Sequence, residues 1–177
     1  MALDTTVGGP DSESYISATD ASTYHLNHGN DAWSDGSADE QEAALRRATI
    51  WLDGRYRRLW KGNKANIAIV EGGSPPEQSL AWPRINVVDD EGSVISSTSI
   101  PRAVRYACAE AALRELSAPG SLFPDLGKET SSESVGPIRV TYVVGAEDRT
   151  EITIIDDLLS GLLIGDGNTS VTFFNRA

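Results

Sequence analysis

The stretch at residues 99–117 constrains the fold more than any other, because apolar and small side chains occupy most sides of one predicted helix. Pro101 is tolerated in the first turn of such a helix, and Pro119 with Gly120 ends the pattern. The polar positions form one narrow stripe, made of Arg102, Arg105, Glu110 and Arg114. Since small side chains let neighbouring helices approach closely, we expect this helix to be the axis of a bundle.

Capping signals predict two more helices before this axis. Ser17 and Asp20 begin a short helix over residues 17–29, with Tyr24 and Leu26 on its buried side. Ser37 and Glu40 form a capping box, and apolar residues then recur at steps of three and four up to Gly62. We therefore predict a long amphipathic helix over residues 37–62.

The connection over residues 62–99 is rich in glycine and proline and predicts little regular structure. Within it, Leu80, Ala81, Trp82, Pro83 and Arg84 form an apolar anchor followed by a fixed backbone angle and a cation. We expect Trp82 to plug the core, with Leu80, Pro83 and the helical Tyr24 as further anchors.

The remaining segments predict extended arms around the bundle. Residues 1–14 hold few apolar groups, so we expect an arm there that is flexible or ordered by a partner. Residues 137–144 alternate as a strand does and follow a polar stretch at 118–136, and residues 153–163 predict a short capped helix. The sequence thus predicts a mainly α protein, a small helical bundle with a long extended arm and a C-terminal tail, divided into residues 1–14, 15–118, 119–150 and 151–177.

Local signatures of catalysis and cofactor binding are absent from the sequence. The chain has no glycine-rich nucleotide loop, no H-E-x-x-H and no G-x-S-x-G, and Cys108 is its single cysteine. His25 and His28 are three residues apart and could share a metal, but ordinary helix-end roles are the favoured interpretation. We expect no enzyme activity, no cofactor and no resident metal, with Cys108 packed as a small apolar group.

Charge is distributed unevenly along the chain. Fifteen basic and 26 acidic side chains give a net charge of −11, which opposes non-specific attraction to nucleic-acid phosphates. The chain has nine acidic residues and no lysine or arginine before Arg46, whereas the middle is mildly basic. Copies of the chain could therefore attract one another middle to end, with solvated surface charge as the alternative.

One basic cluster resembles a nucleic-acid platform. Arg55, Arg57, Arg58, Lys61 and Lys64 are interleaved with two aromatic residues, Tyr56 and Trp60, and such cations hold phosphates while such rings stack bases. The same cations would also suit the end of a helix or an acidic neighbouring subunit, which is the favoured interpretation. We expect Arg55 and Arg58 to lie at an interface with a partner.

The predicted strand and tail also indicate partners. A strand leaves unpaired backbone groups unless another strand lies beside it, which applies to Arg139, Val140 and Tyr142. Val171, Phe173 and Phe174 form an apolar tail behind a glycine-rich tether, and such a tail would favour aggregation unless it is covered. We therefore predict that both segments contact other protein subunits.

The order of these features resembles the head-tail connector adaptors of tailed bacteriophages, whose members are often described as DnaT-like single-strand binding proteins. The resemblance covers about residues 15–116. Its most specific motif is W-P-R at residues 82–84 with the preceding Leu80, and weaker support lies at residues 139–142 and 158–159. The other motifs that carry it are Tyr15-Ile16-Ser17, Tyr24, Gly29-Asn30, Trp33 and Ile100-Pro101.

The resemblance implies a structural role in the virus particle. Members of that family join head to tail into a closed ring, usually of about twelve copies, below the portal protein. A tail-side stopper or tail terminator protein docks beneath the ring, and genomic DNA passes through it without specific binding. The implied location is the head-tail neck of the virion, after assembly in the host cytoplasm and without a membrane. The alternative is a single-stranded DNA-binding protein of replication.

Overall fold

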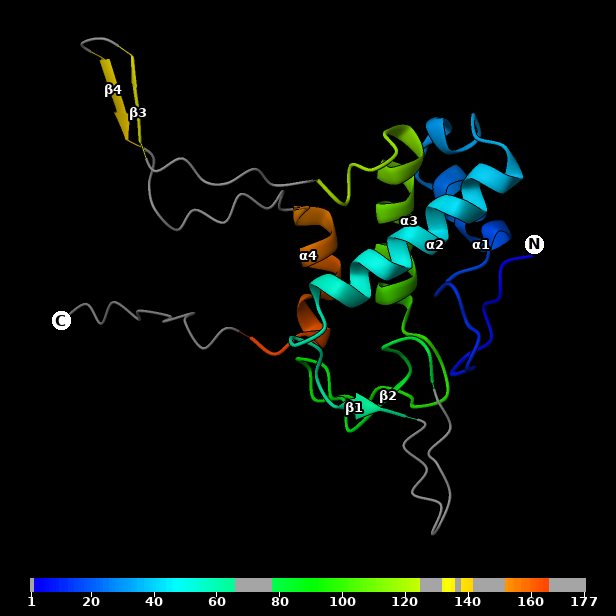
Figure 1. Ribbon diagram of the computed structural model, residues 1–177. Helices are drawn as coiled ribbons and strands as arrows, with labels where there is room; N and C mark the ends of the chain where they lie inside the picture. Colours follow the sequence, from blue (N-terminus) through cyan, green and yellow to red (C-terminus); the bar gives the residue numbers. More distant parts are fainter. Residues whose placement is uncertain (1, 66–77, 125–131, 136–137, 142–151, 166–177) are drawn as a thin grey trace, which may run out of the picture.

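The computed structural model describes residues 2–65, 78–124, 132–135, 138–141 and 152–165 (Figure 1). Helices dominate this part of the chain, so the predicted mainly α fold class is confirmed. The helices are α1 (Ala18–Asn27), α2 (Ala38–Arg55), α3 (Arg102–Ser117) and α4 (Thr153–Leu159), with the short 3₁₀ turns η1 (Asp31–Trp33) and η2 (Ser160–Leu162). The strands are β1 (Asn63–Lys64), β2 (Arg84–Ile85), β3 (Ser132–Val135) and β4 (Ile138–Thr141).

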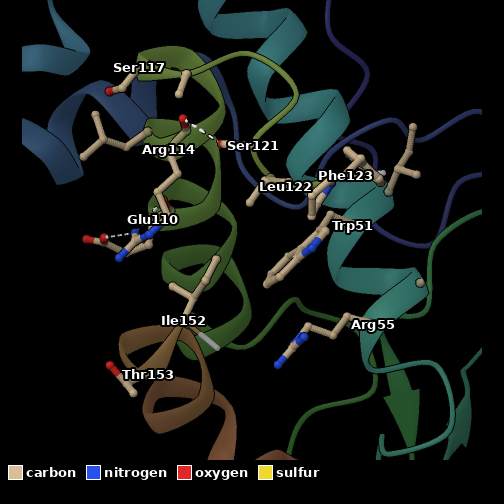
Figure 2. A pocket seen from close by; sticks show the side chains of 15 residues that line it. Trp51, Arg55, Glu110, Arg114, Ser117, Ser121, Leu122, Phe123, Ile152 and Thr153 are labelled. Carbon is tan, nitrogen blue, oxygen red and sulfur yellow. Dashed lines mark hydrogen bonds and ion pairs between the residues drawn. The ribbon is translucent and has the colours of Figure 1, made fainter. Parts of the chain in front are cut away.

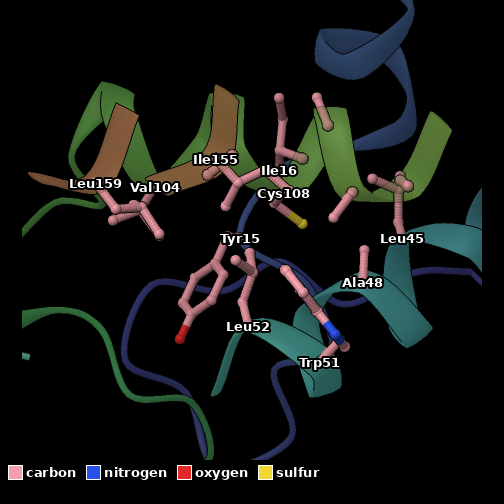
Figure 3. Packing of buried hydrophobic residues seen from close by; sticks show 14 of the residues in the cluster. Tyr15, Ile16, Leu45, Ala48, Trp51, Leu52, Val104, Cys108, Ile155 and Leu159 are labelled. Atoms are coloured by element: carbon pink, nitrogen blue, oxygen red, sulfur yellow. The ribbon is translucent and has the colours of Figure 1, made fainter. Parts of the chain in front are cut away.

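Helix α3 is the axis of the bundle and packs against α1, α2, α4 and η1. Its small residues Ala107, Cys108 and Ala111 are fully buried. Figure 3 shows the apolar side chains of α2 and α4 meeting this helix, with Leu52 on one side and Ile155 on the other. The close approach that the small residues of α3 predict is thus present in the structure.

Both predicted helix starts are present. Ser17 accepts a hydrogen bond from the Asp20 amide at 3.1 Å, and Ser37 and Glu40 form the reciprocal capping box of α2. Tyr24 is buried on α1, but Leu26 is 76% exposed, so the expectation that Leu26 helps to bury this helix is wrong. Two residues along a helix rotate a side chain by about 200°, so Leu26 lies on the opposite side from Tyr24.

Helix α2 ends at Arg55, before the predicted end at Gly62. The amides of Leu59 and Trp60 both bond the Tyr56 carbonyl, which closes a turn. The chain then pairs with a distant segment, because the Lys61 amide donates to the Leu162 carbonyl at 3.0 Å and Trp60 bridges to Leu163. Gly62 does not end the helix and instead allows the chain to pass close to residue Ile85. Its φ is +68°, and an added Cβ would lie 2.2 Å from the Ile85 carbonyl oxygen.

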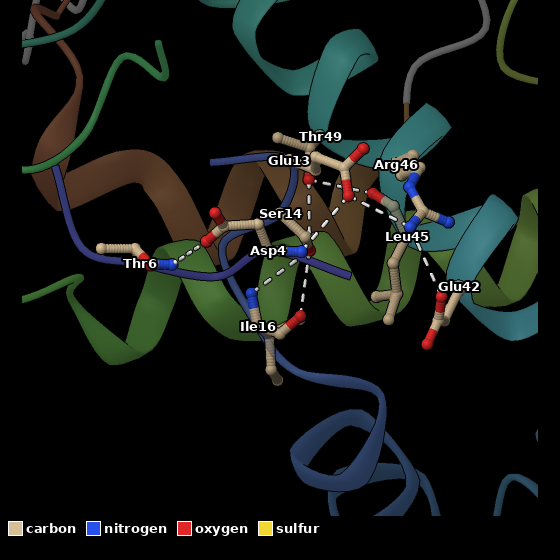
Figure 4. A network of polar contacts seen from close by, with 9 residues as sticks. All are labelled: Asp4, Thr6, Glu13, Ser14, Ile16, Glu42, Leu45, Arg46 and Thr49. Carbon is tan, nitrogen blue, oxygen red and sulfur yellow. Dashed lines mark hydrogen bonds and ion pairs between the residues drawn. The ribbon is translucent and has the colours of Figure 1, made fainter. Parts of the chain in front are cut away.

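Residues 2–14 pack on the bundle, which corrects the prediction of a flexible arm there (Figure 4). The Asp4 carbonyl accepts the amides of Glu13 and Ser14, and Glu13 forms an ion pair with Arg46 of α2 at 3.0 Å. The Ser14 hydroxyl is buried and receives a hydrogen bond from Thr49 at 3.4 Å. Composition underestimates this segment because hydrogen bonds and an ion pair fix it where apolar side chains are few.

The segment after residue 77 places its apolar anchor in the core. Trp82 is fully buried and meets Trp60 edge to face, with the two rings 5.7 Å apart. Asp53 of α2 accepts hydrogen bonds from the Tyr15 hydroxyl and from the Ala81 amide. Burial raises the pKa of Asp53. Three separate segments are thus tied together, and β1 pairs antiparallel with β2 beside them.

Strand β4 finds its partner within the same chain. It pairs antiparallel with β3, and Arg139 and Val140 lie opposite Ser134 and Glu133. The sequence analysis placed the β3 residues in an extended arm and predicted no strand there. Because β3 supplies the backbone partner of β4, the backbone groups of β4 give no reason to expect a strand from another subunit. Helix α4 and η2 follow the predicted apolar pattern and bury Ile155, Leu159 and Leu162. Within the described ranges, no helix is long and apolar enough to cross a membrane.

Candidate functional site

An open apolar groove of about 1080 Å³ lies between α2 and α3 (Figure 2). Residues 118–124 close one end of the groove, and the start of α4 lies at the other. The large apolar side chains that line the groove come from all four segments: Ile50, Trp51, Leu113, Leu122, Phe123 and Ile152. Two of them are unusually exposed for their type, Ile50 at 63% and Phe123 at 43%.

The spacing of residues along α2 places several side chains on the face that lines the groove. On α2 the pairs Ile50–Trp51 and Gly54–Arg55 are four residues apart and therefore lie one turn above another. No atom lies within 4 Å of where a Cβ of Gly54 would stand, so the groove is open at this position. On α3 the groove is bordered by Glu110 and Arg114, two residues of the predicted polar stripe.

Glu115 fixes the loop that closes the groove. Its side chain is almost completely buried and accepts hydrogen bonds from the amides of Gly120 at 2.7 Å and Leu122 at 3.4 Å. Arg47 of α2 bonds the same carboxylate at 2.5 Å and lies over the Phe123 ring, 5.6 Å from its centre. A buried carboxylate with these partners holds Leu122 and Phe123 in place against α2.

The charges at the groove are two arginines and one glutamate. Arg55 stacks on the Trp51 ring at 5.5 Å and on Tyr56 at 5.7 Å, and it forms no ion pair within the described residues. Arg114 is paired with Glu110 at 3.2 Å, and Glu110 also accepts the Tyr24 hydroxyl. Burial, with Glu110 beside it, raises the pKa of Tyr24. The groove is therefore apolar, with a cation at one edge that has no acidic partner among the described residues, and this combination suits an apolar partner that carries a negative charge.

The predicted basic cluster does not form one surface. Tyr56 and Trp60 are 2% and 3% exposed, so neither ring is open to a nucleic-acid base. Lys61 is held by Asp90 at 2.8 Å and by the Gly161 carbonyl, and Lys64 by the carbonyls of Gln78 and Ser79. The platform is divided because α2 ends at Arg55, and only Arg57 and Arg58 project fully from the following turn.

The predicted core anchors lie in the body of the bundle. Trp82 and Pro83 are buried, Tyr24 is buried against α3, and Leu80 is partly buried. Arg84, which completes the motif, donates to the carbonyls of Lys61 at 2.7 Å and Ala81 at 3.1 Å. Burial lowers the pKa of this guanidinium.

The structure describes only some of the predicted interface residues. Arg139 and Val140 lie in β4, whereas Tyr142, Val171, Phe173 and Phe174 lie outside the described residues. Of the predicted interface residues within the described ranges, Arg55 alone lines the groove, and Arg58 is exposed three residues beyond the end of α2.

The two histidines have other partners than a metal. The ring nitrogens of His25 contact the Ala109 carbonyl and the Asn30 side chain, both at 3.2 Å, and His28 contacts the Tyr24 carbonyl at 2.7 Å. Burial lowers the pKa of His25 and raises that of Cys108. Across the part of the chain that the structure describes, no three histidine, cysteine or acidic side chains gather as a metal site would need.

Sequence reasoning did not identify the groove. Ile50 gave a usable signal, since it departs from the stripe of Leu45, Ala48 and Leu52 and so must face outward on α2. Phe123 gave none, because its position depends on the buried Glu115 and on a turn within the segment assigned to an arm.

One family model matches the chain, over residues 1–177, and its description reads "Putative DnaT-like ssDNA binding protein". The chain belongs to this family. No curated protein and no solved structure matches it. The family description supports single-strand binding more directly than it supports the connector role.

Proposed function

We propose that this protein is a structural adaptor of a phage head-tail connector and that it acts by docking to other proteins, without catalysing a reaction. In this role copies form a ring beneath the portal, join it to a tail-side stopper or tail terminator protein, and leave a passage for the genome. The observation that carries the proposal is the open groove, whose exposed Ile50 and Phe123 form a surface suited to another protein.

Residues that carry the family resemblance lie in the core of the helical bundle. Tyr15, Tyr24, Trp33 and Trp82 all lie in the buried core, although they are spread over nearly 70 positions of the chain. Core positions of this kind specify a fold and say little about chemistry. The resemblance therefore supports the adaptor through a common architecture, and the groove supports it through a docking surface.

The overall charge also suits a passage for DNA. A net charge of −11 repels phosphate, so a ring built from such chains would let a duplex slide, whereas a basic wall would retain it. This argument favours passage through the ring over tight binding.

The second candidate is single-stranded DNA binding, which the family description favours. The groove offers one feature for it, the exposed Phe123 ring with Arg47 above, since a base could stack there beside a cation. Against it, Tyr56 and Trp60 are buried, which removes the rings that the sequence suggested.

The decisive experiment removes the protein from the virus that encodes it. For an adaptor, we expect heads filled with DNA and lacking tails, while genome replication continues. Particles made with the protein should contain it in stable amounts by mass spectrometry. Complete tailed particles formed without the protein would refute the adaptor.

Strand binding is tested separately with a labelled oligonucleotide at several salt concentrations. The adaptor predicts weak binding that Arg47→Ala and Phe123→Ala leave unchanged. Tight binding with a steep salt slope, lost in both variants, would instead establish the second candidate. Arg102→Ala on α3, outside the groove, serves as the control that also removes one cation.

A further inference from the structure

Acidic side chains gather on one flank of the bundle. This acidic flank consists of Asp31, Asp35 and Asp39, around η1 and the start of α2, together with Leu26 at the end of α1. All four side chains are exposed, and within the described residues the three aspartates form no ion pair. The flank therefore combines uncompensated negative charge with one large apolar side chain.

Basic side chains gather at the other end of α2. This basic flank consists of Arg55, which lines the groove, and of Arg57 and Arg58, which are exposed in the turn that follows α2. None of the three arginines forms an ion pair within the described ranges.

Acidic groups on α4 reduce the positive charge of the basic flank only in part. Asp156 accepts the Tyr56 hydroxyl, and Asp157 is exposed on the same helix. Two carboxylates thus stand near three arginines, and the flank keeps a positive excess beside an open apolar groove.

The two flanks cannot meet within one copy. Helix α2 has 18 residues, which separates its ends by about 27 Å. Figure 1 shows α1 and the start of α2 on one side of the bundle, and the end of α2 beside α4 on the other. Opposite charges at opposite sides of a rigid body are complementary between copies related by a rotation, in a heterologous contact.

We infer that the acidic flank of one copy docks on the basic flank of the next, with Leu26 entering the groove between α2 and α3. The inference rests on the proposed function in one respect, because it names the surface through which the adaptor joins its own copies. Because the acidic flank and the basic flank carry opposite charges, the occupant of the groove is a second copy of this chain.

The test uses charge reversal in the full-length protein. One variant carries Arg57→Glu and Arg58→Glu, and another carries Asp31→Arg and Asp35→Arg, at exposed positions that contribute no hydrogen-bonding side chain within the described residues. Each variant alone should associate about tenfold or more weakly than the wild type, because like charges then face each other. A mixture of the two variants should associate again, since each interface regains opposite charges, and so should a chain that carries all four changes.

Association is measured by sedimentation and native mass spectrometry at low and high salt. The control carries Asp11→Arg and Glu91→Arg, two exposed acidic positions outside both flanks, which change the net charge by the same amount and in the same direction as Asp31→Arg with Asp35→Arg. This control should leave association unchanged, and Leu26→Ser should weaken it. Circular dichroism establishes that each variant folds.

Several outcomes would overturn the inference. These are a wild type and a mixture that both fail to associate, reversed variants that associate as the wild type does, and a mixture that gains nothing over its parts. Failure here differs from failure of the proposed function. If the flanks pair in solution but tailed particles form without the protein, only the function is wrong, and if the protein joins heads and tails without using these flanks, only this inference is wrong.

Discussion

Replacing Trp82 tests the packing on which the bundle depends. The side chain is fully buried and meets Trp60 edge to face at 5.7 Å. Truncation of a buried tryptophan to alanine removes about 3 to 5 kcal/mol through lost contacts and the cavity that remains. The Trp82 indole N–H has no hydrogen-bond partner among the described residues, so its removal returns about 1 kcal/mol or more of the cost of burying it. We therefore expect Trp82→Ala to cost about 3 kcal/mol, at the lower end of the range.

Trp82→Phe separates the two contributions. It keeps an aromatic ring beside Trp60 and removes the unpartnered N–H, so we expect a cost below about 1.5 kcal/mol. Both variants are compared with the wild type by urea unfolding followed with far-ultraviolet circular dichroism, which does not depend on the number of tryptophans. A cost for Trp82→Ala below about 1 kcal/mol, or a larger cost for Trp82→Phe than for Trp82→Ala, would refute the reasoning.

Three further predictions concern other parts of the chain. Hydrogen bonding to Arg46 lowers the pKa of the Glu13 carboxyl below its ordinary value of 4.5, so its contribution is complete above that pH and is lost as pH falls through the lowered pKa. Hydrogen exchange in residues 2–14 should then rise in acid before the helices open, and Glu13→Gln should abolish this step. Glu115→Gln should cost about 1.5 to 3 kcal/mol in urea unfolding because the buried carboxylate binds Arg47 and two amides, whereas Glu42→Gln at a more exposed ion pair should cost much less. Deletion of residues 171–177 should leave the helical circular dichroism unchanged and reduce assembly into particles, and normal assembly would exclude that role for the tail.

Local sequence signals determined where α1 and α2 begin, whereas α4 begins at Thr153 without the side-chain cap that the sequence predicts. Ser17 and the capping box of Ser37 and Glu40 act over three residues, so their hydrogen bonds can be read from the sequence alone. The apolar character of α3 likewise predicts its central place, since a helix with few polar sides has to be covered by others.

Tertiary structure decided where α2 ends and how the first residues lie. The helix ends at Arg55 because the following turn pairs with residues about one hundred positions later, through Lys61 and Leu162. Residues 2–14 are fixed by Arg46 and Thr49, which no local pattern connects to them. Both depend on contacts between distant positions, and sequence periodicity carries no information about such pairs.

The groove also depends on contacts between residues that are distant in the sequence. Its exposed Ile50 is visible in the sequence as a departure from the apolar stripe, but its closure depends on the buried Glu115 holding Leu122 and Phe123. The sequence by itself therefore determined a helical body and an uneven charge. Only the three-dimensional arrangement placed the acidic and basic groups on opposite flanks, because their separation is set by the length of α2 and by its packing across α3.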